Sequence, residues 1–134
     1  MVSGEPTSPD TQRFPKRERM VSQRLIDMLF SGSRSVAAFP LRAVYLNKER
    51  AQGEEAVLVL ISVPKKRFHH AVDRNRVKRQ IREAYRHHKK LLHKALPSDQ
   101  QLLLAFVWLS DKHYPSGEVE QRVTTLMNRI AEKL

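Results

Sequence analysis

Hydrophobic and polar residues follow two different periods along the chain, and the shorter period predicts strands. Two apolar runs bounded by turn residues predict strands at residues 40–46 and 56–63. The polar segment between them contains Gly53, so the simplest connection is a hairpin with a long loop. A third run, residues 101–109, is apolar at almost every position and predicts a central strand.

The longer period, 3.6 residues, predicts three helices. The first is capped by Ser22 and ends near Ser31, before Gly32, with a core stripe of Val21, Leu25, Met28 and Leu29. The second ends before Pro97 and carries an apolar stripe made of Val77, Ile81, Ala84, Tyr85, Leu92 and Ala95. The third follows Pro115 and carries Val119, Val123, Leu126, Met127, Ile130 and Leu134.

The resulting order of elements is α-β-β-α-β-α, with room for one more short strand. This order predicts an α/β two-layer sandwich in which the helices cover one side of a single sheet. A chain of 134 residues is the size of one domain. Because prolines are interspersed with small polar residues near the start, we expect residues 1–18 to be a flexible tail and residues 19–134 to form the domain.

The chain has no segment that predicts membrane insertion. Its longest apolar runs reach eight residues, whereas a membrane-spanning helix needs about 20. The absence of cysteine excludes disulfides, thiolate nucleophiles and sulfur-ligated metals, and it suits a reducing compartment. We therefore expect a cytoplasmic protein with no membrane partner.

Positive charge is concentrated in one part of the chain. The formal net charge is +11, and residues 65–94 hold twelve lysines and arginines against Asp73 and Glu83, which is +10 of that total. Such a local density predicts a polyanionic partner, and nucleic acid is the simplest one. Helical phase places one cationic ridge opposite the apolar stripe, composed of Asn75, Lys78, Arg79, Arg82, Arg86 and Lys89.

Other functional classes fit the sequence less well. A metallonuclease needs two or three convergent acids, but the basic segment contains only Asp73 and Glu83. A free DNA-binding helix does not need the apolar stripe of a packed domain. His69-His70 and His87-His88 are adjacent pairs, and neighbours in sequence rarely bind the same ion. We expect no metal site in the protein and interpret these histidines as adding partial positive charge or stacking on bases.

Residues 62–66 (SVPKK) and 71–83 (AVDRNRVKRQIRE) contain a specific pattern. The run Arg-Asn-Arg-x-Lys-Arg-x-x-Arg after Ala-Val resembles the signature of the bacterial ribonuclease P protein subunit. The Leu-Phe-Ser-Gly end of the first predicted helix and the C-terminal strand and helix also resemble that family. The resemblance covers residues 16–134.

The resemblance implies a ribosomal-protein-like sandwich with a left-handed β-α-β crossover. It also implies a protein that binds the catalytic RNA of ribonuclease P and precursor tRNA, from which the 5′ leader is removed. The RNA is then the catalyst, the protein contributes no catalytic residue, and Mg²⁺ is held mainly by the RNA. We expect a protein monomer in a 1:1 ribonucleoprotein. The alternative is a non-catalytic RNA-binding module, such as a ribosomal or assembly protein, that uses the same ridge.

Arginine and lysine together suit a folded RNA backbone, because guanidinium groups contact phosphates bidentately and ammonium groups act as point charges. The predicted RNA-binding residues are Lys65, Lys66, Arg74, Asn75, Arg76, Lys78, Arg79, Arg82 and Arg86. Asn75 is uncharged; it either braces the loop after Lys65, contacts a ribose 2′-hydroxyl, or caps the helix.

Single-stranded RNA favours an apolar or aromatic floor beside positive charge. The resemblance places such a floor for the leader in a cleft between the first helix and the sheet. Ile26 and Phe30 are the candidates on the helix, and Tyr45 is the candidate on the strand. Ordinary core packing is the alternative for each of them.

Overall fold

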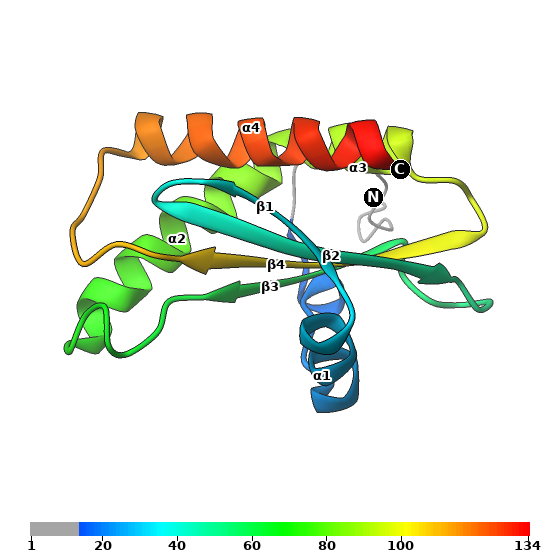
Figure 1. Ribbon diagram of the computed structural model, residues 1–134, viewed down its shortest axis with the longest axis horizontal. Helices are drawn as coiled ribbons and strands as arrows, with labels where there is room; N and C mark the ends of the chain where they lie inside the picture. The colour runs from blue at the N-terminus through cyan, green and yellow to red at the C-terminus, as the bar shows by residue number, and fades with distance from the viewer. Residues whose placement is uncertain (1–13) are drawn as a thin grey trace, which may run out of the picture.

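A four-stranded sheet lies between helices on its two faces (Figure 1). The structure, a computed structural model, describes residues 14–134. Its elements are the 3-10 helix η1 (Lys16–Glu18), α1 (Gln23–Ser31), β1 (Arg34–Ala38), β2 (Leu41–Glu49), β3 (Val57–Ser62), α2 (Ala71–His88), α3 (Lys90–Ala95), β4 (Gln100–Trp108) and α4 (Ser116–Lys133). The predicted α/β sandwich is confirmed, with β1 as the additional short strand.

The strand order is β1-β2-β4-β3. β1 and β2 form the antiparallel hairpin, β2 pairs antiparallel with β4, and β4 pairs parallel with β3. The predicted hairpin between the second and third strands is therefore wrong, because β4 lies between them. β4 is buried at most of its positions, and a strand that is apolar on both faces is best accommodated at the centre of a sheet.

The two faces of the sheet are covered unequally. The larger core lies between the sheet and helices α2, α3 and α4, and it encloses Trp108, Tyr85 and Phe106. On the opposite face α1 packs over a smaller cluster that includes Leu29 and Leu103 (Figure 1). The expectation that all helices share one side is wrong for α1, because alternate residues of β4 leave a second apolar surface to be covered.

The segment before α1 belongs to the folded domain. Phe14 and Glu18 are buried, Arg19 pairs with Val59 in a parallel bridge, and the N–H of Met20 donates to the carbonyl of Val59 at 2.8 Å. The predicted tail of residues 1–18 is therefore wrong for residues 14–18, because an apolar ring and the bridge to β3 hold them. Residues 1–13 lie outside the described residues.

The predicted helix ends are largely confirmed. Ser22 caps α1 by accepting a hydrogen bond from the N–H of Leu25, although Val21, predicted in the core, is 84% exposed. The long basic helix is divided at Lys89 into α2 and α3. The stripe of α4 is buried as predicted, from Val119 to Ile130. Within residues 14–134, no helix has the length and apolar character that crossing a membrane requires.

Candidate nucleic-acid interface

Helix α2 presents one face to the core and one to solvent, as its apolar period predicts. Val77, Ile81 and Tyr85 are buried against the sheet and α4. Arg76 and Arg79 lie on the surface, and Lys78 and Arg82 are half-buried at the side that approaches β3. Packing of the apolar stripe therefore fixes the direction in which the cations point.

The loop before α2 is held against the segment that follows β4. The ring of Phe68 stacks on His113 with centroids 4.6 Å apart, and Arg67 lies 3.4 Å from Asp111. His113 in turn lies 3.0 Å from Asp73 in the first turn of α2. These contacts leave the two lysines at the start of the loop, Lys65 and Lys66, exposed beside the N-terminal end of α2.

Arg74 braces this loop, a role that the sequence predicts as one alternative for Asn75. Nη1 of Arg74 donates to the carbonyls of Phe68, at 2.9 Å, and His69, at 3.1 Å. Asn75 is exposed within the helix, so its predicted alternative as a helix cap is wrong, because α2 begins at Ala71 with His70 at the cap position. No side-chain hydrogen bond of Asn75 occurs within residues 14–134, and its amide faces solvent.

Most cations of this surface have no acidic partner. Within the described part of the chain, no carboxylate pairs with any of Lys65, Lys66, Arg76, Lys78, Arg79 or Arg82. Arg86 differs, since it lies 2.7 Å from Glu83. That contact raises the pKa of Arg86 and lowers the pKa of Glu83. The net positive charge is thus greatest on the first three turns of α2 and the preceding loop.

Burial, followed by the neighbouring charges of Arg19 and Arg79, lowers the pKa of Arg82. Like charges held close together favour an anion between them, and phosphate matches the planar guanidinium group. The surface is therefore suited to a sugar-phosphate backbone.

Lys89 does not belong to the cationic ridge. Its side chain is 1% exposed and its Nζ lies 3.1 Å from Oε1 of Glu18. Helical phase predicts that Lys89 points to the same side of α2 as Arg82. Residues 14–20 cover that side of the helix near Lys89, and Glu18 supplies the carboxylate that pairs with it. The prediction failed because this segment was interpreted as a tail.

The α1 face retains two of the three residues predicted for the leader. Phe30 is 45% exposed, and Ile26 is half-buried against the smaller apolar cluster. Tyr45 is 2% exposed in the larger core, on the opposite face of the sheet, so its assignment to this cleft is wrong. Val44, one residue earlier, faces α1 instead, because alternation defines two faces of a strand without revealing which one α1 covers.

The two histidine pairs occupy different environments. His69 and His70 are exposed in the cationic loop, where an RNA partner can reach both rings, and their added charge or stacking on bases stays a prediction. Nε2 of His88 lies 2.8 Å from Glu120 of α4, and Nδ1 of His87 lies 3.9 Å from the same carboxylate oxygen. This second pair links α2 to α4.

Comparison with known proteins places this geometry in context. The family model described as Ribonuclease P matches residues 14–131. The chain is 40% identical over 127 residues to the ribonuclease P protein component of Porphyromonas gingivalis, covering 93% of this chain and 91% of that protein. It is 36% identical over 115 residues to the ribonuclease P protein component of Chlorobaculum tepidum, covering 81% and 75%.

Solved structures show the same fold. The RNase P protein of Staphylococcus aureus superimposes with a TM-score of 0.68 at 22% identity, covering 86% of this chain and 95% of that one. The RNase P protein of Thermotoga maritima superimposes with a TM-score of 0.64 at 20% identity, covering 84% and 96%.

Proposed function

The chain belongs to the Ribonuclease P family, as a protein component of that endoribonuclease, and we propose that it grips the RNA subunit through the cationic surface of α2. One observation carries the proposal: six cations on α2 and its preceding loop have no acidic partner within residues 14–134. Guanidinium and ammonium groups arranged in this way track a folded RNA backbone without requiring a base sequence.

In this proposal the RNA subunit carries out the hydrolysis, and the protein supports it by binding. The protein acts as a monomer in a 1:1 complex with the RNA, in the cytoplasm. The lack of cysteine suits that compartment. The protein raises the affinity for RNA and substrate by supplying positive charge where phosphates approach one another.

Magnesium in this proposal is bound mainly by the RNA. Within residues 14–134, no three His, Cys, Asp or Glu side chains come together in a way that could hold a metal ion. In this proposal the protein side chains neutralise phosphates, which lowers the repulsion that magnesium would otherwise have to offset.

The single-stranded 5′ leader of precursor tRNA lies in this proposal along the α1 face of the sheet. Phe30 offers an exposed aromatic ring on which a base can stack. Ile26 and the apolar cluster beneath α1 supply the floor. The cations of α2 lie on the other side of the β3 edge, so one protein reaches both RNA partners.

The proposed function is tested by reconstitution. The purified chain is added to a bacterial ribonuclease P RNA and precursor tRNA, at a low magnesium concentration chosen so that the RNA alone gives no cleavage. We expect accurate removal of the leader only when protein and RNA are both present. A chain that neither binds this RNA nor restores cleavage would refute the proposal.

A further inference from the structure

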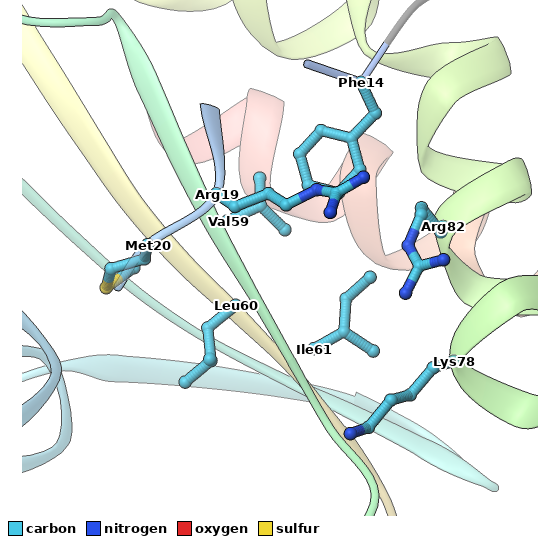
Figure 2. Close-up of a pocket in the computed structure, with 8 residues that line it drawn as sticks. All are labelled: Phe14, Arg19, Met20, Val59, Leu60, Ile61, Lys78 and Arg82. Carbon is cyan, nitrogen blue, oxygen red and sulfur yellow. The ribbon is translucent and has the colours of Figure 1, made fainter. Parts of the chain in front are cut away.

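A cleft of about 180 Å³ opens at the outer edge of β3, between α2 and the segment before α1 (Figure 2). Three cations from two separate elements border it: Arg19 from the N-terminal segment, and Lys78 and Arg82 from α2. Leu60 and Ile61 of β3 line its floor, with Phe14 at one end. The pattern of the sequence predicts no role for Arg19, because the prolines and polar residues that precede it predict a tail.

The cleft holds three positive charges without a balancing carboxylate. Within residues 14–134, Arg19, Lys78 and Arg82 form no ion pair. Burial, followed by the charges of Arg19 and Arg79, lowers the pKa of Arg82, while the charge of Glu83 on the same helix acts in the opposite direction. Arg19 and Arg82 therefore face each other as like charges across the cleft. An anion between them would remove that repulsion.

Arg19 is held in place before any ligand binds. Its guanidinium carbon lies 5.3 Å from the centroid of the Phe14 ring, a cation–π contact. On either side of it, Glu18 pairs with the buried Lys89 at 3.1 Å and the N–H of Met20 bonds to β3. The backbone at Arg19 is thus fixed on both sides and its exposed guanidinium group rests against one ring, so less conformational entropy is lost when it binds an anion.

The cleft is continuous with the α1 face. Met20 and Leu60 line it, and both also belong to the apolar cluster beneath α1. The carbonyl of Val59 accepts a hydrogen bond from the N-terminal segment. The backbone polar groups of Ile61, two residues later, point to the same edge of the sheet, past the end of that segment. A single-stranded RNA that leaves the α1 face at this edge of the sheet would next reach the three cations.

The dimensions favour a polymer over a small molecule. Pockets for small ligands enclose about 300–1,000 Å³, whereas this cleft has about 180 Å³ and is open to solvent. A phosphate group and part of its ribose fit such a space while the rest of the strand continues outside. Resting on the proposed function, we propose that this cleft binds a backbone phosphate of the substrate's 5′ leader as the leader passes from the α1 face to α2.

The test compares Arg19→Gln with the matched control Arg24→Gln, an exposed arginine on α1 that does not line the cleft. Each full-length variant is assembled with the RNA subunit, and binding is measured for precursor tRNAs that carry one neutral methylphosphonate linkage at successive leader positions. With the unaltered protein, we expect one linkage to weaken binding about tenfold, equivalent to about 1.4 kcal/mol. With Arg19→Gln, that linkage should have little further effect, because its partner is already gone.

Lys78→Gln, from the other wall of the cleft, should make binding insensitive to the same linkage. Because Lys78 also belongs to the surface proposed to grip the RNA subunit, this variant is measured with the RNA subunit at saturating protein, and only its linkage profile is compared. Arg24→Gln should leave the profile unchanged, and all variants should retain their unfolding temperature. Arg19→Gln should also reduce, by about 0.7, the slope of the logarithm of leader affinity against the logarithm of salt concentration, which corresponds to one lost phosphate contact.

A complex that cleaves precursor tRNA but shows the same linkage profile with and without Arg19 would overturn this inference and leave the proposed function intact. Equal losses for precursor and mature tRNA, together with weaker binding to the RNA subunit, would place the contact on that subunit and also overturn it. A chain that fails to bind the RNA subunit at all would instead refute the proposed function.

Discussion

The ammonium group of Lys89 lies 3.1 Å from Oε1 of Glu18, and the two side chains are 1% and 6% exposed. Lys89 stands at the junction of α2 and α3, and Glu18 ends η1. Burial raises the pKa of Glu18, although Lys89 acts in the opposite direction. The pair therefore fixes where the N-terminal segment lies, and with it Arg19, while contributing little net stability.

Removing one member of this pair should be more harmful than removing both. Lys89→Met leaves the Glu18 carboxylate buried without its cation, and we expect the free energy of unfolding to fall by about 3 kcal/mol at pH 7. Glu18→Gln combined with Lys89→Met removes both charges and should recover most of that loss. Denaturant unfolding measures all three chains; a double variant as unstable as the single one would show that the pair itself supplies the stability.

Acid should destabilise the fold through His93. Burial, followed by the charges of Lys89 and Arg50, lowers the pKa of His93 to about 4 from an ordinary value near 6.5. Because the folded state disfavours the protonated ring, this residue's contribution is complete above about pH 6.5 and is lost as the pH falls toward 4. His93→Gln should flatten the pH dependence of unfolding across that window. The exposed His69, changed to Gln, is the control and should leave the curve unchanged.

Local pattern predicts most of the elements because each buries one regular face. The stripe of α4 and the cap at Ser22 depend on residues within a few positions of one another, so a single sequence contains the needed information. The signature of α2 likewise predicts a cationic helix whose Val77 and Ile81 turn inward. These features require no knowledge of distant partners.

The failed predictions for Lys89, Tyr45 and the hairpin depend on contacts between distant segments. Lys89 is buried because Glu18, 71 residues earlier, reaches it, and Tyr45 faces the large core because α1 occupies the opposite face. The hairpin assigned to residues 40–63 fails because β4 inserts between its strands. Hydrophobic periodicity and secondary-structure propensity do not contain such pairings, because the pairings arise only when whole surfaces of helices and strands compete for burial.

The unpaired arginines of α2 should contribute more to RNA binding than the paired one. Arg76→Ala with Arg79→Ala should weaken binding to the RNA subunit by about 1–3 kcal/mol per strong contact and reduce the salt slope by about one per lost phosphate contact. Arg86→Ala is the matched control, because Glu83 at 2.7 Å already offsets the charge of Arg86. Binding titrations at several salt concentrations measure the affinity and the salt slope. If Arg86→Ala weakens binding as much as the double variant does per residue replaced, the importance of unpaired charge is contradicted.

The aromatic ring of Phe30 should recognise the leader without supporting the fold. It is 45% exposed, so Phe30→Ala should change the free energy of unfolding by only about 0.5 kcal/mol. If a base stacks on this ring, affinity for precursor tRNA should fall by about 1–3 kcal/mol while affinity for mature tRNA stays the same. Phe39 is the matched control, since it is 60% exposed and lies beside α4, where Arg122 donates to its carbonyl. Phe39→Ala should affect neither ligand, and an equal loss of both ligands with Phe30→Ala would mean that the ring shapes α1 and does not touch the leader.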